Sequence, residues 1–282
     1  MSETISVSPP LVAADIAAQY GTLSQVEAVT LGGSWASGTA EPGSDIDLYV
    51  YTTAEIPVQV RAGLVQARAA YAEIDNQFWE PGDEWIEAET EIHVDVMFRS
   101  TAWIEEQLDR VLRRHEASVG YSTCLWHNVA FSKALYDRQG WFVTLQHTAQ
   151  QPYPEGLRRA IIAKNYPILR QTASSYRYQL EHAVAREDWV SVNHRVAAML
   201  ASYFDILFAL NRTLHPGEKR LVKIAQAQCE RLPEGMSQQV TALIKAVCQD
   251  PCPVIDKIDA LLDSLDDLLK DEGLLTPDGY LK

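Results

Sequence analysis

The sequence contains few cysteines, and their spacing does not suggest a metal site. The four are Cys124, Cys229, Cys248 and Cys252. Cys248 and Cys252 could lie one helical turn apart, but Pro251 stands between them and no second pair accompanies them, unlike the ligand pairs of a structural zinc site. We therefore expect reduced thiols, as is usual in the cytosol.

The sequence also lacks any long apolar run. The richest stretch, residues 199–210, is interrupted by Ser202 and Asp205 and falls short of the roughly 18 apolar residues that a membrane-spanning helix requires. The first residues, Met1-Ser2-Glu3-Thr4, show no basic segment followed by an apolar run, the pattern of a signal peptide. These absences predict a soluble cytoplasmic protein with no membrane partner.

Basic residues are in short supply. The 24 lysines and arginines are outnumbered by 38 aspartates and glutamates, which gives a formal net charge of −14 and a pI near 4.9. Such a surface repels polyanions, so the composition disfavours extended nucleic-acid binding, although a small local basic pocket is compatible with it. The 282 residues and 47% hydrophobic content indicate a folded protein with two ordinary domains or one large one.

The first hundred residues alternate between helical and strand patterns. Helices are expected over 12–20 and 61–74, and strands over 26–31, 46–51 and 91–98. Successive side chains of a strand point to opposite faces. One face of the third strand is therefore apolar, through Ile92, Val94, Val96 and Phe98. The other face carries polar chemistry, through Glu91, His93, Asp95 and Met97.

From about residue 101 onward the apolar positions follow a helical period. The expected helices span residues 101–115, 155–179, 189–210, 217–231, 237–247 and 254–272. Pro152 and Pro154 indicate a domain junction. The sequence therefore predicts an α+β protein, with strands and helices over residues 1–150 and an α-helical domain over residues 151–282.

One segment between the first two strands combines glycines, serines and aspartates. It runs from Gly33-Ser34 through Gly38 to Ser44-Asp45-Ile46-Asp47. Glycines after a strand allow a tight turn that brings backbone N–H groups close to a ligand. If a helix begins at Ser34, its first N–H groups and the serine hydroxyl form a phosphate site.

The aspartates of this segment suit a metal ion. Asp45 and Asp47 lie two residues apart at the entry to a strand, so both carboxylates leave the same face. Adjacent carboxylates repel each other unless a cation sits between them, and oxygen ligands with open positions favour Mg²⁺ or Mn²⁺. Asp95, on the polar face of the third strand, could complete a one- or two-metal centre for in-line phosphoryl transfer.

This pattern, Gly-Ser-x-x-x-Gly followed by Ser-Asp-Ile-Asp and a strand aspartate, resembles the DNA polymerase β-type nucleotidyltransferase superfamily. The order of elements is most similar to that of the small bacterial nucleotidyltransferases that act on aminoglycosides or lincosamides. The resemblance implies a catalytic domain with a mixed β-sheet flanked by helices over residues 1–150. It implies a helical bundle that binds substrate or nucleotide over residues 151–282.

The same resemblance implies roles for individual residues. Gly33, Ser34 and Ser44 would hold the nucleoside triphosphate, and Asp45 and Asp47 would be catalytic metal ligands. The third acidic residue of the family pattern, Asp95, would be either a further metal ligand or the base that deprotonates the acceptor hydroxyl.

A second resemblance lies in residues 210–220, whose sequence is Leu-Asn-Arg-Thr-Leu-His-Pro-Gly-Glu-Lys-Arg. Related enzymes carry an Asn-x-x-Tyr/His-x-Pro-Gly-x-Lys-like segment between two C-terminal helices. The resemblance implies that Lys219 reaches the nucleotide phosphates. A cation at the start of a helix opposes the helix dipole, which suggests a reason of this kind for its presence, although a solvated lysine is the alternative.

The acceptor side of the reaction is less clearly encoded. Residues 78–85 pack aromatic and acidic side chains together and would suit a lip over a cationic or sugar-like acceptor, or a surface turn whose tryptophans are buried at the domain boundary. Glu84, Glu89 and Glu91 are alternatives to Asp95 as general base. His93 either faces the site or is a hydrogen-bonded strand histidine.

The expected activity is Mg²⁺-dependent transfer of a nucleoside monophosphate to a hydroxyl of a small molecule. AMP from ATP is the first choice of donor, with other nucleoside triphosphates as alternatives, and an aminoglycoside-like or lincosamide-like antibiotic is the first choice of acceptor, which would make the enzyme a resistance factor. The rival hypotheses are modification of a protein or a tRNA, as in toxin–antitoxin systems, and an inactive relative that binds nucleotide. A homodimer is compatible with the resemblance.

Overall fold

The computed structural model describes residues 9–78, 80–247, 249 and 253–281, and the chain divides into two compact units. The N-terminal unit comprises residues up to 109 together with 125–151. The C-terminal unit comprises residues 110–124 and those from 152 onward. Of the cysteines, Cys124 and Cys229 are free thiols, while Cys248 and Cys252 lie outside the described residues.

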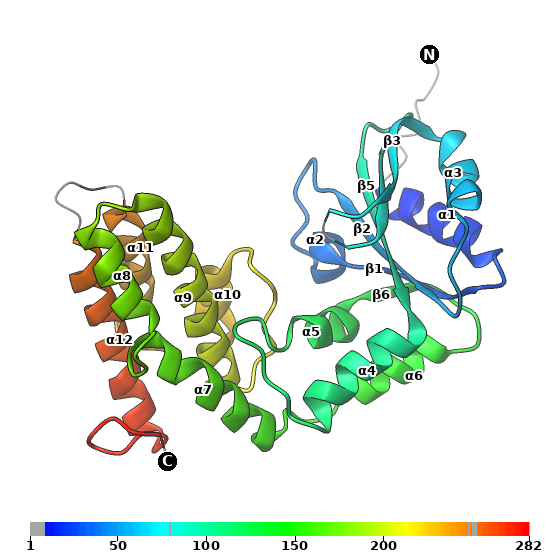
Figure 1. Cartoon of the computed structure of the whole chain (residues 1–282). Helices are drawn as coiled ribbons and strands as arrows, with labels where there is room; N and C mark the ends of the chain where they lie inside the picture. Colours follow the sequence, from blue (N-terminus) through cyan, green and yellow to red (C-terminus); the bar gives the residue numbers. More distant parts are fainter. Residues whose placement is uncertain (1–8, 79, 248, 250–252, 282) are drawn as a thin grey trace. The chain divides into compact units, whose positions relative to one another are not determined.

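A mixed six-stranded sheet forms the N-terminal unit, with strand order β3-β4-β5-β2-β1-β6 (Figure 1). The strands are β1 (Val26–Leu31), β2 (Ile46–Thr52), β3 (Ala69–Asn76), β4 (Gly82–Glu87), β5 (His93–Ser100) and β6 (Lys133–Asp137). Strands β2 and β5 are parallel, and every other neighbouring pair is antiparallel. This pairing brings residues distant in sequence together at the start of β2.

Helices cover both faces of this sheet. They are α1 (Pro9–Gly21), α2 (Gly33–Ser37), α3 (Val58–Gln66), α4 (Thr101–Leu112), α5 (Cys124–Phe131) and α6 (Trp141–Ala149). Ile16 and Tyr20 of α1 join the apolar core with Val50 and Val94. On the opposite face, the ring of Tyr51 stacks on Phe142 of α6, with the ring centroids 5.4 Å apart. Helix α6 therefore covers the polar face of the sheet near the C-terminal end of β2.

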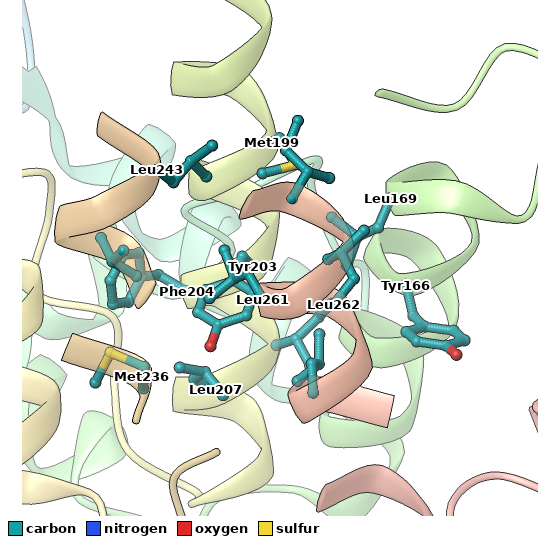
Figure 2. Packing of buried hydrophobic residues seen from close by; sticks show 14 of the residues in the cluster. Tyr166, Leu169, Met199, Tyr203, Phe204, Leu207, Met236, Leu243, Leu261 and Leu262 are labelled. Atoms are coloured by element: carbon teal, nitrogen blue, oxygen red, sulfur yellow. The ribbon is translucent and has the colours of Figure 1, made fainter. Parts of the chain in front are cut away.

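The C-terminal unit is a bundle of helices around α9. Its helices are α7 (Glu155–Arg170), α8 (Tyr176–Ala185), α9 (Trp189–Leu210), α10 (Leu221–Gln228), α11 (Met236–Ala246) and α12 (Val254–Asp271). Met199, Tyr203 and Leu207 of α9 pack with Leu261 and Leu262 of α12 in the core (Figure 2). The predicted α+β fold, a mixed sheet flanked by helices followed by a helical region, is confirmed.

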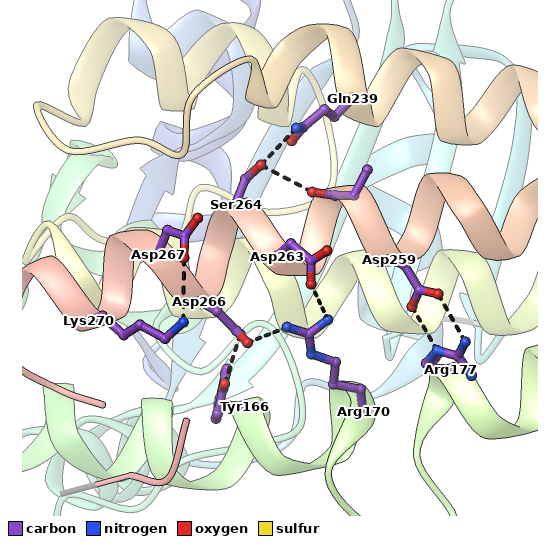
Figure 3. Close-up of polar contacts among 11 residues, drawn as sticks. Tyr166, Arg170, Arg177, Gln239, Asp259, Asp263, Ser264, Asp266, Asp267 and Lys270 are labelled. Carbon is purple, nitrogen blue, oxygen red and sulfur yellow. Dashed lines mark hydrogen bonds and ion pairs between the residues drawn. The ribbon is translucent and has the colours of Figure 1, made fainter. Parts of the chain in front are cut away.

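Arginines of α7 and α8 neutralise part of the acidic helix α12 (Figure 3). Arg170 pairs with Asp263 at 2.6 Å and also with Asp266, and Arg177 pairs with Asp259 at 2.7 Å. The pairs with Asp263 and Asp259 are partly exposed and add little stability, whereas Asp266 is buried.

A buried polar network attaches the segment 110–124 to the bundle. The carboxylate of Asp205 on α9 accepts hydrogen bonds from the backbone N–H of Ser122 at 3.0 Å and from its hydroxyl at 2.6 Å. Asn165 of α7 donates to Asp205 at 3.3 Å and accepts from the backbone N–H of Gly120 at 2.9 Å. Buried polar groups need such partners, so these residues hold the segment in place.

Three of the sequence predictions for the N-terminal unit are wrong. The expected helix over 61–74 ends at Gln66, and its second half forms β3, because pairing with β4 outweighs the helix propensity of its alanines. The expected loop over 78–85 contains the first residues of β4. Residues 133–137, expected to continue the helical pattern, form β6 along β1.

Two helix predictions in the C-terminal unit also need correction. The helix expected over 155–179 is interrupted after Arg170, and α8 begins after Ser175, whose hydroxyl accepts a hydrogen bond from the Tyr178 N–H as an N-cap. The helix expected over 217–231 is confined to α10. Among the described residues, no helix has the length and apolar character needed to span a membrane.

Candidate active site at the start of β2

Three carboxylates form a row across neighbouring strands. The parallel register of β2 and β5 places Asp47 beside Asp95, and the antiparallel register of β4 and β5 places Glu84 on the other side of Asp95. Adjacent strands lie about 4.8 Å apart, and side chains in register share one face of the sheet. The sheet therefore brings together two of the predicted aspartates and one of the glutamates.

His93 lies between the carboxylates of Asp45 and Glu84. Its Nδ1 atom is 3.9 Å from the Asp45 carboxylate, and its Nε2 atom is 3.9 Å from the Glu84 carboxylate. His93 precedes Asp95 by two residues on β5 and shares its face. Of the two alternatives for this histidine, its position favours the one in which it faces the candidate site.

Asp95 is partly buried and lies close to several other carboxylates, and both features affect its pKa. Burial raises the pKa of Asp95 to about 6, and the charges of Glu84, Asp47 and Asp45 contribute in the same direction, while His93 opposes them. Carboxylates that repel each other in this way favour a bound cation. The donor set, oxygen atoms of aspartates on one face, is the set that Mg²⁺ or Mn²⁺ prefers.

The carboxylates of this row are not arranged around one metal position. Within residues 9–78, 80–247, 249 and 253–281, no group of three or more His, Cys, Asp or Glu side chains is positioned to hold a metal ion. The Asp45 side chain is 59% exposed. A metal centre here would therefore require rearrangement of these side chains.

A glycine turn packs directly against Asp47. Gly33 has φ of +56°, and a Cβ atom there would lie 1.8 Å from the Asp47 Oδ2 atom. The backbone N–H of Gly32 donates to the Asp47 carbonyl oxygen at 2.8 Å. Only glycine combines this conformation with this contact. The phosphate-binding residues and the metal-binding residues of the sequence prediction therefore adjoin each other.

The rest of the predicted motif shapes the approach to β2. The helix that contains Ser34, α2, has only five residues, so the turn's own N–H groups matter more than a helix dipole. The indole of Trp35 donates to the carbonyl oxygen of Ser44 at 3.3 Å. The hydroxyl of Ser44 accepts from the backbone N–H of Glu41 at 2.9 Å. Ser44 thus fixes the loop that leads into Asp45.

The three glutamates considered as general base occupy different places. Glu84 faces the site, and the side-chain amide of Asn76 on β3 donates to its carboxylate at 2.9 Å. Glu89 is exposed in the connection between β4 and β5, and Glu91 is exposed at its end. The role of Asn76 was missed, because its strand was expected to be helical until Ile74.

A cavity of about 590 Å³ opens beside Asp45. It is lined by Trp35, by residues 40–45 and by residues 90–93. Its lining contains the acidic side chains of Glu41, Asp45 and Glu91 and no lysine or arginine. The cavity therefore favours a ligand with positive charge.

Only part of the segment 78–85, expected to form an aromatic lip, is a loop, because β4 begins at Gly82. Trp85 is buried in the core on β4, and its indole donates to Glu87 at 2.9 Å. Phe78 is 83% exposed, and Trp79 lies outside the described residues. The alternative in which a tryptophan of this segment is buried is correct for Trp85, although it packs in the core of the N-terminal unit.

Lys219 belongs to the C-terminal unit. It is exposed in the connection between α9 and α10 and precedes the first residue of α10, Leu221. It is not a residue of the helix itself, so the argument from the helix dipole loses force. Its contact with nucleotide phosphates stays a prediction.

Two protein families match separate parts of the chain. Residues 15–117 match the family described as nucleotidyltransferase domain, in agreement with the resemblance that the sequence motif suggests. Residues 123–221 match a family described as a domain of unknown function, DUF4037. No curated protein shows a significant match.

Among solved structures, the chain is similar to the 1.90 Å crystal structure of a nucleotidyltransferase-like protein from Exiguobacterium sibiricum 255-15. The two share 12% sequence identity with a TM-score of 0.43, over 92% of this chain and 74% of that one. A likeness this distant carries no inference about the activity.

Proposed function

We propose that the protein transfers a nucleoside monophosphate, AMP from ATP in the first instance, to a hydroxyl of a small cationic molecule, and the match of residues 15–117 to the nucleotidyltransferase-domain family supports this proposal. The observation that carries this proposal is the row of Asp47, Asp95 and Glu84 beside the turn at Gly33. A phosphate-binding turn next to clustered carboxylates is the arrangement that phosphoryl transfer requires.

Asp45, Asp47 and Asp95 would hold Mg²⁺ or Mn²⁺ in this proposal. The pKa of Asp95 is raised mainly by burial and further by the surrounding negative charges, which fits this assignment because a cation, like a proton, would neutralise the carboxylate. When bound, the metal neutralises the phosphates and lowers the pKa of the attacking hydroxyl. Gly33 and Ser34 would present backbone N–H groups to the phosphate chain.

Glu84 is the residue that we assign as acceptor of the hydroxyl proton. Its carboxylate shares the face of Asp95 and is oriented by Asn76. A base held in one orientation removes a proton effectively once the acceptor lies within hydrogen-bonding distance. Asp95, with three negative neighbours, is better suited to the metal.

The acceptor would bind in the cavity beside Asp45. Its carboxylates and the aromatic ring of Trp35 suit a cationic, sugar-like molecule, such as an aminoglycoside-like antibiotic, and a lincosamide-like amine is the next choice. The net charge of −14 attracts such a molecule and repels tRNA. The activity would then confer antibiotic resistance.

The test is pyrophosphate release from ATP and Mg²⁺ with a panel of aminoglycosides, lincosamides, tRNA and purified proteins, followed by mass detection of the product. We expect release with a cationic small molecule and its loss in Asp47→Asn. Nucleotide found only on tRNA or protein would contradict the small-molecule acceptor. No release with any acceptor, together with unchanged ATP binding in Asp45→Ala and Asp47→Ala, would indicate an inactive relative.

A further inference from the structure

The N-terminal unit contains very few cations with which to bind a nucleotide. Its basic side chains other than histidine are Arg61, Arg68, Arg99, Lys133 and Arg138. A nucleoside triphosphate keeps negative charge even with one divalent cation bound, and proteins compensate such charge with lysine or arginine near the phosphates. The partners of these five residues therefore decide which of them can serve.

Three of the arginines are committed to carboxylates. Arg61 pairs with Asp83 at 2.7 Å, and Arg68 pairs with Glu87 at 3.0 Å. Arg99 is buried, forms two hydrogen bonds with Glu80 at 2.9 and 3.0 Å, and lies over the ring of Tyr49. Separating a buried charge from its partner is costly, which applies to the buried Arg61 and Arg99 and in part to the half-buried Arg68, so we expect these pairs to persist.

Arg138 is committed to the main chain at the opposite end of β1. Its guanidinium donates to three carbonyl oxygens around the start of that strand, those of Gly21, Leu23 and Val26, at 2.6 to 3.1 Å. The glycine turn leaves the other end of β1, after Leu31. Arg138 therefore stabilises the entry to the strand and does not reach the turn.

Lys133 is placed differently. It is the first residue of β6, and the register pairs it with Leu31, the residue from which the chain enters Gly32, Gly33 and Ser34. Its side chain is exposed, and its ammonium group donates to the backbone carbonyl oxygen of Trp35 at 3.2 Å. The cation thus lies on the residue that follows Ser34 in the phosphate-binding turn.

We infer that Lys133 is a nucleotide-binding residue whose ammonium group contacts the phosphate chain of the nucleoside triphosphate. This inference rests on the proposed function. The partner of Lys133 is a neutral carbonyl oxygen, and a phosphate oxygen forms a stronger, charge-assisted hydrogen bond with an ammonium group. The exchange requires only a rotation of an exposed side chain. Asp47 contacts the turn at Gly33, and Lys133 contacts it at Trp35. A metal ion held by Asp47 and the ammonium group of Lys133 would then bind the same phosphate chain.

The test compares wild type, Lys133→Ala, Lys133→Arg and Lys257→Ala in the full chain. Lys257 is an exposed lysine of α12 and serves as the matched control. Affinities for ATP with Mg²⁺, for inorganic pyrophosphate and for AMP are measured by calorimetry or by competition. We expect Lys133→Ala to weaken ATP and pyrophosphate roughly 10- to 100-fold and AMP far less, with the affinities largely restored in Lys133→Arg and unchanged in Lys257→Ala.

Steady-state kinetics and thermal unfolding complete the test. The KM for ATP should rise in Lys133→Ala by a larger factor than kcat falls, with an unchanged Tm. ATP affinity in Lys133→Ala equal to that of wild type would overturn the inference. An equal loss for AMP and pyrophosphate, accompanied by a lower Tm, would also overturn it, because Lys133 would then only support the turn. Absence of ATP binding in wild type itself would overturn the proposed function instead.

Discussion

The contact between Gly33 and Asp47 connects the proposed phosphate-binding turn to a proposed metal ligand. The positive φ of Gly33 turns the chain, and the missing side chain admits the Asp47 carboxylate. These two requirements can be separated, because Gly38 also has a positive φ, +71°, but would meet nothing within 4 Å if a Cβ were added.

We predict that Gly33→Ala lowers kcat/KM by at least about 100-fold, because the new methyl group displaces the Asp47 carboxylate in addition to a backbone strain of roughly 1–3 kcal/mol. Gly38→Ala carries a similar strain without the clash and should retain most of the activity. Steady-state assays and thermal unfolding of both variants check this. Equal losses of activity would show that strain alone matters and would contradict the proposed role of the contact.

Glu84 provides a second test at the residue scale. Glu84→Gln keeps the shape of the side chain and its hydrogen bond from Asn76 but cannot take up a proton, so kcat should fall roughly 100-fold or more while the KM for ATP changes little. The matched control is Glu89→Gln, an exposed glutamate outside the row, which should behave as wild type. If Glu84→Gln keeps the kcat of wild type, Glu84 is not the base.

At the scale of helices and strands, the sequence predicted elements whose pattern is local. The strand over 26–31 and the helix over 189–210 are present at the predicted residues. Asp95 was identified because its strand alternates polar and apolar residues. Glu84 could not be singled out from Glu89 and Glu91, since its place beside Asp95 depends on the register between β4 and β5. Lys133 was missed because only the pairing of β6 with β1 brings it to the turn.

The network around Asp205 carries a prediction of the same scale. Asp205→Ala leaves the N–H of Ser122 without its buried acceptor and removes one hydrogen bond each from the Ser122 hydroxyl and the Asn165 amide, which keep carbonyl acceptors, so the free energy of unfolding should fall by roughly 1–3 kcal/mol. Asp267→Ala, an exposed aspartate of α12, should change it by less than about 0.5 kcal/mol. Chemical denaturation measures both. A stability equal to wild type in Asp205→Ala would contradict the anchoring role.

At the scale of the whole molecule, each unit contains a carboxyl group whose pKa is raised to about 6, mainly by burial, namely Asp95 and Asp205. Between the ordinary pKa of 3.8 and about 6, the folded protein keeps protons that the unfolded chain has lost. The contribution of these two groups to the free energy of unfolding is therefore complete below about pH 4 and is lost as the pH rises through about 6.

We predict that the metal-free protein loses roughly 1–3 kcal/mol of stability from these groups between pH 4 and pH 7, after a discount for solvent screening. Mg²⁺ competes with the proton at Asp95, so it should raise the Tm more at pH 8 than at pH 5. Asp95→Asn should weaken that difference. Thermal unfolding with Mg²⁺ and with EDTA tests this, and an equal Mg²⁺ effect at both pH values would contradict it.

The chain passes between the two units three times, after residues 109, 124 and 151. During synthesis, β6 leaves the ribosome later than residues 110–124, while the helices α7 and α9 that hold this segment follow later still. Neither unit can thus be completed before the other has begun, and no single cut yields both intact. Recombination at a single point in the chain therefore cannot exchange one unit without breaking the other.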